Sequence, residues 1–569
     1  MRSPVRRLPV LATLLALLLG VSGAAAPIGL ARGDTSTTVR GIDVDATTIP
    51  ELQALMDARR LTSVQLTQFY LQRIRKLNSS LNAVITVSPT ALADARATDR
   101  ARRRGVDLPL LGIPVIVKDN INTTGMPTTA GSYALEGSSP SDAFIVERLR
   151  AAGALIIGKA NLSEWANFRS APSSSGWSGI GGQTNMAYVL DRNPCGSSSG
   201  SGVVASADLA TVAVGTETDG SIVCPSGANS VVGIKPTVGL WSREGIVPIS
   251  AEQDTAGPMT RNVTDAAVVL GAATGVDPSD PATAAQVGNA FTDYTQFLDE
   301  DALDGARIGV WRTGTFGIDP DVDAIMEATI DELEAAGATI VDPADIPIEP
   351  AFEPEFAALL CEFKDDIASY LETYTDPPYP QTLQDLIDFN EANPELEGPW
   401  NSLIFELAQA TGGRDADCAA TRETANAIAR AAIDDTLAAH DLDAIIAPTN
   451  GPAWVTDPVN GDLGGDFSTF IGSSSPAAIA GYANITVPAG YVSGLPIGVS
   501  FIGGRWDEPT LIGLTYAFEQ AAGVRVPPQF LDSLDGTASA SAGAGRGKAE
   551  DRRGPAPNRG GRWLMPPLR

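Results

Sequence analysis

The chain has 569 residues, enough for one large domain or several smaller ones. Hydrophobic residues make up 44% and charged residues 19%, an ordinary balance for a soluble globular protein with a large core. The 68 acidic and 39 basic residues give a formal net charge of −29. Because such a charge repels phosphate backbones, we expect no nucleic-acid partner.

The N-terminal segment has the three parts of a secretory signal peptide. Three arginines form a cationic start, an apolar run covers residues 8–21, and three alanines supply a small-residue cleavage site. The apolar run is short for a membrane span. We therefore expect residues 1–26 to be removed and the mature protein to be secreted without stable membrane association. An uncleaved anchor is the alternative, and residues 27–46 are predicted to be a polar linker.

After the linker, predicted helices alternate with predicted strands. Thr48 and Pro50 suit a helix start, and apolar residues follow at helical spacing. The runs "LLGIPVIVKDNI" and "GALIIGK" are apolar, rich in β-branched residues and bounded by glycine or charge, as buried strands are. A helix followed by a strand recurs at 141–165, 321–341 and 432–449. This recurrence predicts an α/β protein whose sheet is covered on both faces.

The last part of the chain contains another pair of strands and then a tail. Residues 484–504 are predicted to form a strand, a Gly-Leu-Pro turn and a second strand, after a more helical and acidic region at 260–440. Residues 536–569 are mostly Gly, Ala, Pro and Arg, with almost nothing to bury, so we expect disorder there. Their arginines form a basic patch that could touch an anionic surface, but a plain tail is the preferred interpretation.

The four cysteines fall into two pairs with different expectations. In a secreted protein Cys361 and Cys418 could form a disulfide, although sequence alone does not show that they meet. Cys195 and Cys224 flank two serine-rich loops and are predicted to be small buried packing residues.

Histidine chemistry is nearly excluded, because His440 is the only histidine in the chain. It lies at the end of a predicted helix, where it can interact with the last carbonyl groups. A Ser-His-Asp triad would require this residue, and a zinc hydrolase would require several His or Cys ligands. We expect neither, and no metal site.

Lysine is the alternative base, and Lys118 stands out. It follows the apolar run "GIPVIV" and precedes a polar, glycine-containing loop. Burial at the end of a strand would favour the neutral amine, which can accept a proton from serine. The alternative is a lysine whose stem packs against the core while its head reaches solvent.

Two loops, "GSSSGSG" and "ETDGSIVCPSGAN", supply clustered hydroxyl groups and flexible backbone. Glycine lets backbone N–H groups converge on a developing oxyanion. Either loop alone could be a plain turn or a phosphate-binding loop. Neither ends in Gly-Lys-Ser/Thr, which excludes a Walker loop.

Lys118 and these loops together resemble the amidase signature family, whose catalytic unit is a Ser–cis-Ser–Lys triad. The similarity runs through "GIPVIVKDNI", "GKANLSEWANF", "GSSSGSG", "GTETDGSI" and "GIKPTVGLWSREGIVPIS", and it returns in "ITVPAGYVSGLPIGVSFIG". It covers roughly residues 47 to 530. It implies a single large α/β/α layered domain around a mixed central sheet, placed at residues 47–535, and a hydrolase without a cofactor.

The resemblance assigns a role to each matching residue. Ser221 of "TDGSI" is the acyl-forming nucleophile, Lys118 is the base, and Ser197 is the bridging serine. The Gly196–Ser197 peptide bond is expected to be cis, which would aim Ser197 at both partners. The candidates for the oxyanion hole are the backbone N–H groups of Thr218, Asp219, Gly220 and Ser221.

One part of the nucleophile loop departs from the family pattern. Most members have Gly-Gly-Ser-Ile-Arg, whereas Asp219 and Val223 replace the first glycine and the arginine. "GTETDGSIVCP", with "SEWANFRS" and "GWSGIGGQT", is most similar to the peptide amidase branch, which releases ammonia from C-terminal peptide amides. Asp219 is expected to repel a free C-terminal carboxylate. The alternative is that it only accepts hydrogen bonds within the loop.

The sequence therefore predicts a secreted, cofactor-free amidase acting on peptide amides or other small-molecule amides. An aryl or aliphatic amidase, or an esterase, is the alternative within the family. The ammonia-channelling component of a tRNA amidotransferase is less expected, because a signal peptide would separate it from its partners. A non-catalytic secreted binding protein is the alternative of another class, against which the intact Lys118, Ser197 and Ser221 argue. The oligomeric state is not predicted.

Overall fold

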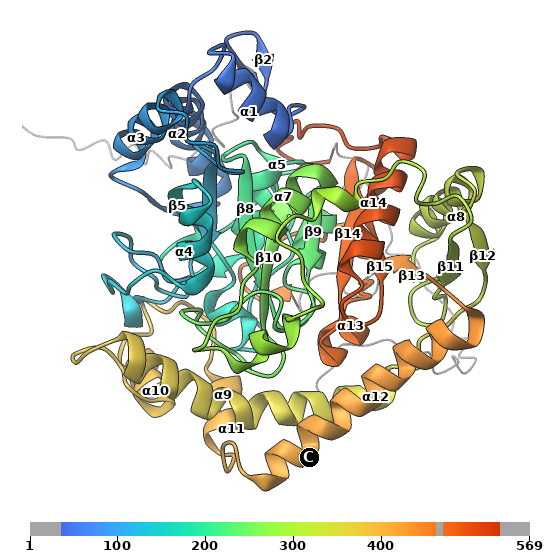
Figure 1. Cartoon of the computed structure of the whole chain (residues 1–569). Helices are drawn as coiled ribbons and strands as arrows, with labels where there is room; N and C mark the ends of the chain where they lie inside the picture. The colour runs from blue at the N-terminus through green and yellow to red at the C-terminus, as the bar shows by residue number, and fades with distance from the viewer. Residues whose placement is uncertain (1–35, 463–469, 535–569) are drawn as a thin grey trace, which may run out of the picture. The chain divides into compact units, whose positions relative to one another are not determined.

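An 11-stranded mixed sheet forms the centre of the protein (Figure 1). The computed structural model describes residues 36–462 and 470–534, so the expected signal peptide and the expected tail lie outside the described residues. In order across the sheet, the strands are β12 (Thr339–Val341), β11 (Arg307–Val310), β13 (Ala444–Pro448), β15 (Leu495–Ile502), β14 (Asn484–Val492), β9 (Val232–Lys235), β10 (Thr255–Thr260), β8 (Val212–Glu217), β4 (Pro114–Lys118), β5 (Leu155–Ala160) and β3 (Val84–Val87).

Parallel and antiparallel pairs both occur in this sheet. Strand β4 is parallel to both β5 and β8, whereas β10 is antiparallel to β8 and β9. Strands β14 and β15 form the antiparallel hairpin that the sequence predicts around the Gly-Leu-Pro turn. Every residue of β4 and of β8 is buried, which accounts for their continuous apolar runs. The expected mixed sheet is confirmed.

Helices cover both faces of the sheet, as expected. Thr48 caps the first helix in a reciprocal capping box with Glu51, and Pro50 lies in its first turn. None of the described helices has the length and hydropathy that a membrane span requires. The helices are α1 (Ile49–Asp57), α2 (Ser63–Leu81), α3 (Ala91–Arg103), α4 (Phe144–Ala151), α5 (Ser199–Ser206), α6 (Val223–Ala228), α7 (Val263–Ala273), α8 (Pro320–Ala335), α9 (Phe352–Tyr374), α10 (Leu383–Ala392), α11 (Leu403–Gln409), α12 (Ala416–His440), α13 (Ser475–Ala480) and α14 (Glu508–Ala522).

The expected acidic, helical region at 260–440 corresponds to α7 to α12. Helices α9 and α12 pack against each other along the lower edge of Figure 1. A disulfide between Cys361 and Cys418 joins them, so this pair of cysteines does meet. Helix α9 also packs on α10 and α11 through a cluster that includes Phe363 and Phe405. A second helical layer therefore lies beside the sheet.

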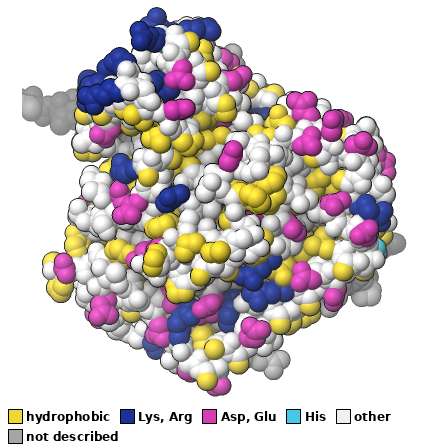
Figure 2. All heavy atoms as spheres, in the orientation of Figure 1, with side chains coloured by type: hydrophobic (Ala, Val, Ile, Leu, Met, Phe, Trp, Pro, Cys, Tyr) yellow, Lys and Arg dark blue, Asp and Glu magenta, His cyan; other side chains and the backbone are white. Residues whose placement is uncertain are grey.

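Basic side chains gather in two places on the face shown in Figure 2. Lys and Arg side chains lie at the top, over α1 to α3, and again in the lower middle of the view, while acidic side chains are spread more widely. The exposed arginines of α3 and its C-terminal end are Arg96, Arg100, Arg103 and Arg104. The C-terminal tail is therefore not the only basic segment of the chain.

The expected linker at 27–46 overlaps a short hairpin, β1 (Thr38–Val39) and β2 (Ile42–Asp43). Polar residues dominate this stretch, yet its apolar residues Val39, Ile42 and Val44 are all buried. The folded unit begins at Thr37. Residues 37–46 therefore belong to the domain, because three spaced apolar side chains are enough to dock the segment.

A buried ion-pair network anchors this hairpin to the rest of the domain. Arg525 donates to both carboxylate oxygens of Asp45, at 2.8 and 2.9 Å. Arg261 Nε donates to the carbonyl oxygen of Asp45 at 3.3 Å, and its Nη1 lies 3.3 Å from the Asp208 carboxylate. Burial raises the pKa of Asp208 to about 6, and the positive charge of Arg261 opposes that rise.

We expect Arg261→Ala to lower the free energy of unfolding by about 3–5 kcal/mol, because the buried Asp208 would lose the positive charge that acts on it most strongly. Urea denaturation measures the change. Arg312→Ala is the matched control, because Arg312 makes only partly exposed ion pairs, with Asp342 and Glu327, and its loss should cost less than about 1 kcal/mol. Equal losses in the two variants would contradict this account of the network.

Candidate active site

Lys118 is the last residue of β4 and is completely buried. Its Nζ lies 2.8 Å from Ser197 Oγ, 2.9 Å from Thr216 Oγ1 and 3.3 Å from the Thr216 carbonyl oxygen. Burial lowers the pKa of Lys118 to about 7, and the nearby carboxylates of Asp254 and Glu217 offset this effect only in part. The expected buried strand-end lysine is confirmed, and its head group does not reach solvent.

The hydrogen bonds around Lys118 suit a neutral amine. A neutral amine has two N–H groups and one lone pair. The Thr216 carbonyl can only accept, so one N–H points there, and the Thr216 hydroxyl can accept the second. Asn120 Nδ2 also donates to this hydroxyl, at 2.9 Å. In the neutral amine the lone pair can then face the hydroxyl of Ser197, whereas the charged amine donates to it.

Ser197 is fully buried. It lies in the first serine loop, which leads into α5. The Gly196–Ser197 peptide bond is cis, as the family resemblance implies. Ser198 connects the first loop with the second. Its N–H donates to the carbonyl oxygen of Ser221 at 3.2 Å, and its Oγ donates to the Thr216 carbonyl at 3.0 Å. The three residues that the sequence selects therefore lie in adjoining segments.

Ser221 lies in the turn between β8 and α6, where it borders a large cavity and is 8% exposed. Glu217 holds this turn, because its Oε2 accepts hydrogen bonds from the N–H groups of Ile222 at 2.7 Å and Val223 at 3.0 Å. Gly220 has φ of +77°, a left-handed conformation that favours glycine. Packing and hydrogen bonding thus preset the shape of the nucleophile loop.

The candidate oxyanion donors differ in their surroundings. Within the described residues, the backbone N–H groups of Asp219 and Ser221 donate to no protein acceptor. That of Gly220 interacts with the carboxylate of Glu217. Thr218 is fixed through its other groups, because its Oγ1 donates to Asp254 at 2.5 Å and its carbonyl accepts from Gln253 at 3.0 Å. Unpaired N–H groups beside a serine at a cavity wall suit stabilisation of an oxyanion.

Asp219 does not project freely into the cavity. Ser474 Oγ donates to its Oδ1 at 2.5 Å, and its Oδ2 is buried without a hydrogen-bond partner among the described residues. Burial, and then the negative charge of Glu355, raise the pKa of Asp219 well above its usual range. These contacts favour the interpretation in which Asp219 holds the loop, rather than the one in which its charge repels a substrate carboxylate.

The cavity in front of Ser221 has a volume of about 630 Å³. Both serine loops contribute to its wall, and α9 supplies the opposite side. Apolar side chains form most of the lining, including Phe168, Phe352, Phe356, Leu359, Ile404, Trp454 and Phe470. Among the described residues of the lining, the ionisable side chains are all carboxyl groups: Asp219, Glu349, Glu353, Glu355 and Asp462. The wall therefore offers apolar surface and carboxyl groups but no Lys or Arg among its described residues.

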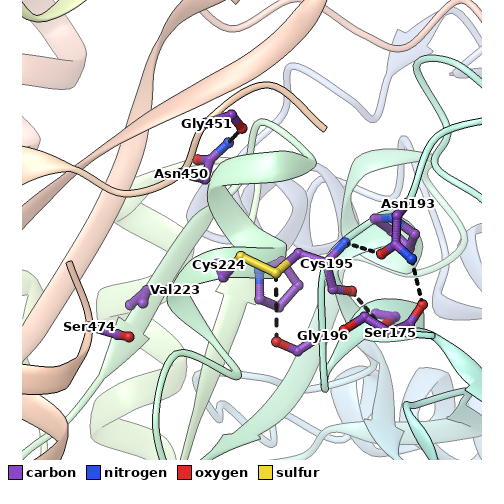
Figure 3. Close-up of a disulfide and its surroundings, with 12 residues drawn as sticks. Ser175, Asn193, Cys195, Gly196, Val223, Cys224, Asn450, Gly451 and Ser474 are labelled. Atoms are coloured by element: carbon purple, nitrogen blue, oxygen red, sulfur yellow. Dashed lines mark hydrogen bonds between the residues drawn. A yellow bond between two sulfur atoms is a disulfide. The ribbon is translucent and has the colours of Figure 1, made fainter. Parts of the chain in front are cut away.

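Cys195 and Cys224 are disulfide-bonded, with 6.0 Å between their Cα atoms. The expectation that they are only packing residues is therefore wrong. The two cysteines are 29 positions apart in the sequence. They meet because, after α5, strand β8 brings the chain back to the start of the first serine loop. The bond joins the two serine loops directly (Figure 3).

Sequence reasoning missed several residues that organise the site. Thr216 and Glu217 both lie within the family motif. Glu217 could have been recognised, because a carboxylate shortly before the start of a helix often accepts hydrogen bonds from the first backbone N–H groups of that helix. Gln253 and Ser474 carry no such sign, because they reach the nucleophile loop only through the folded chain.

His440 lies at the last position of α12, as predicted, and its carbonyl oxygen accepts a hydrogen bond from Arg307 at 2.9 Å. It is not among the residues that line the cavity. In the parts of the chain that the structure describes, no group of three or more His, Cys, Asp or Glu side chains is arranged to hold a metal ion.

Comparisons with known proteins agree with this geometry. A family model described as Amidase matches residues 65–512. The crystal structure of the native peptide amidase from Stenotrophomonas maltophilia is 49% identical, with a TM-score of 0.81, over 85% of this chain and 99% of that chain. A probable amidase of Arabidopsis thaliana is 41% identical over 86% of this chain and 92% of its own length. One component of the glutamyl-tRNA(Gln) amidotransferase of Thermoanaerobacter pseudethanolicus is 33% identical over 85% of this chain and 98% of its own length. The chain therefore belongs to the amidase signature family and is an amidase.

Proposed function

We propose that this amidase hydrolyses the C-terminal carboxamide of peptides and releases ammonia through an acyl-enzyme on Ser221. The observation that carries the proposal is the contact of 2.8 Å between Ser197 Oγ and the buried amine of Lys118, whose pKa is lowered to about 7. A general base with a pKa near neutrality combines a large neutral fraction with useful basicity.

In the proposed reaction, Lys118 accepts the Ser197 proton while Ser197 accepts the proton of Ser221. The Ser221 oxygen attacks the carboxamide carbon, and the N–H groups of Asp219 and Ser221 stabilise the oxyanion, whereas that of Gly220 is engaged by Glu217. The relay then returns a proton to the departing nitrogen, which leaves as ammonia. Water hydrolyses the acyl-enzyme by the same route in reverse and releases the peptide acid.

Two observations support peptide amides as the substrates. The peptide amidase from Stenotrophomonas maltophilia matches nearly its whole length to this chain at 49% identity. The cavity of about 630 Å³ is also wide enough for more than a single amino-acid amide, and its apolar lining suits peptide side chains. Aryl or aliphatic amides and esters are the competing substrates, because the aromatic side chains of the lining would also accept them.

We also propose that the protein is secreted after removal of residues 1–26. The cationic, apolar and small-residue parts of that segment support export. The two disulfides agree with it, because such bonds persist in oxidising compartments. N-terminal sequencing of the protein from the culture medium should begin just after Ala26, and retention of the full chain in the cells would contradict export.

The proposed base predicts the acid limb of the pH profile. Lys118 must be neutral to accept a proton, so kcat/KM should rise with pH around 7, where the lysine loses its proton, and then level off. Steady-state measurement of kcat/KM between about pH 5 and pH 9 tests this acid limb. Lys118→Ala should lower kcat/KM by roughly 10³-fold or more, because base and nucleophile act as a unit.

Two variants serve as controls for this assignment. His440→Ala should keep both the rate and the acid limb of the wild-type enzyme. Ser221→Ala should remain folded but take no label from a fluorophosphonate, which forms a covalent adduct with an activated serine. Loss of the acid limb in His440→Ala, or a wild-type adduct on Ser197, would overturn the proposed roles.

The proposed substrate predicts a clear order of rates. Ammonia release should be fastest with peptide amides, while the matching free-acid peptides should keep their internal bonds intact. An ammonia assay and mass spectrometry on a panel of peptide amides, free peptides, aryl amides and esters would establish the order. Preference for small aryl amides would reject the peptide amidase assignment and leave the triad unaffected.

A further inference from the structure

The two cysteines of the Cys195–Cys224 disulfide flank the two proposed catalytic serines along the chain. Cys195 precedes Ser197 by two residues, and Cys224 follows Ser221 by three residues in the first turn of α6. Figure 3 shows the bond crossing from the loop of Gly196 to the segment that carries Val223. A covalent link of this kind limits how far the two loops can separate.

Each end of the disulfide is tied to its own serine loop. On one side, the Cys195 N–H donates to Asn193 Oδ1 at 2.9 Å, and Ser199 Oγ donates to the Cys195 carbonyl at 2.5 Å. On the other side, the Cys224 N–H donates to the Gly220 carbonyl at 2.9 Å. The position of each sulfur is therefore coupled, through one short segment, to the position of a proposed catalytic serine.

The backbone at Cys195 depends on external support. Its φ is +59°, a left-handed conformation that costs free energy in a residue with a side chain. This residue immediately precedes Gly196 and Ser197, so relaxation here would change the direction of the peptide that carries Ser197. Its hydrogen bonds and the disulfide both hold this conformation.

The disulfide also forms part of the cavity wall. Both cysteines line the substrate cavity, and both also line a smaller pocket with Asn450, Gly451 and Trp454. Cys195 is 5% exposed and Cys224 is 9% exposed. Both cysteines are therefore largely buried, but they border the cavity rather than the closed interior of the domain.

We propose that the Cys195–Cys224 disulfide is a positioning cross-link of the active site, which holds Ser197 and the Ser221 loop at the separation needed for acyl transfer. It follows that the enzyme is fully active only while this bond is oxidised. The inference rests on the proposed catalytic serines, but it does not depend on which amide is the substrate.

The chain contains a matched control for general stabilisation. The Cys361–Cys418 disulfide joins α9 to α12, and neither of its cysteines lines the cavity. It encloses 57 residues of chain, against 29 for Cys195–Cys224. Because the stabilising effect of a cross-link grows with the enclosed loop, removing the control bond should lower Tm at least as much. If removal of the Cys195–Cys224 bond slows catalysis more than removal of the control bond, only a positioning role explains the difference.

The test compares the double variants Cys195→Ala/Cys224→Ala and Cys361→Ala/Cys418→Ala well below both Tm values. The readouts are the second-order rate of fluorophosphonate labelling of Ser221, and kcat and KM for a peptide amide. In the first variant, labelling and kcat should fall about tenfold or more while KM changes less than about threefold, since misplaced reacting groups lose rate more than affinity. The control should stay within about twofold of the wild type. An unchanged labelling rate in the first variant would overturn the proposal.

Reduction of the wild-type enzyme provides the second measurement, for the case in which the first variant does not fold. A dithiol such as dithiothreitol reduces the protein disulfide to two thiols and is itself oxidised to a cyclic disulfide. Loss of Ser221 labelling should follow alkylation of Cys195 and Cys224 with the same time course, and reoxidation should restore it. Full labelling of a reduced, folded enzyme would contradict the inference. An enzyme that labels at Ser221 but ignores peptide amides would refute only the proposed substrate.

Discussion

The site depends on the burial of one amine at the end of a central strand. Strand β4 lies between two parallel neighbours, and all five of its residues are buried, so Lys118 has no path to solvent. The loss of hydration favours the neutral form, whereas the carboxylates of Asp254 and Glu217 favour the charged form. The balance leaves the pKa at about 7. In the proposed mechanism, this sheet position supplies the neutral-pH base that histidine provides in many other hydrolases.

The nucleophile loop depends on a buried carboxylate in a related way. Burial raises the pKa of Glu217, and the positive charge of Lys235 is the largest effect that opposes this rise. Two backbone N–H groups at the start of α6 contribute as well, because they donate to the same oxygen. Glu217 therefore fixes the turn that presents Ser221. Its negative charge also opposes the fall in the pKa of Lys118, so one carboxylate acts on both the turn and the lysine.

The sequence alone predicted the features that a short run of residues determines, but it did not predict those that arise only when distant segments pack together. The apolar run before Lys118 predicted the strand and its buried end, and glycine and serine spacing marked both loops. The cis bond before Ser197 came from family resemblance alone. The hairpin at 37–46 was mistaken for a linker, because its few apolar residues form no helix or strand pattern and are buried only through packing against the rest of the domain. Likewise, nothing in the chain order indicates that Ser474 contacts Asp219 or that Cys195 meets Cys224.

The replacement of the family's arginine by Val223 changes the charge of the cavity wall. It leaves the three proposed catalytic residues unchanged. Where most members have an arginine, Val223 lines the cavity, and no Lys or Arg is present in its described lining. A substrate carboxylate placed before Ser221 would lose its hydration without gaining a cation, near the carboxyl groups of Asp219 and Glu355. A carboxamide carries no charge and avoids that cost. The proposed discrimination against free acids therefore has a basis in the missing cation and the carboxyl groups of the wall, and it does not require Asp219 alone to act by repulsion.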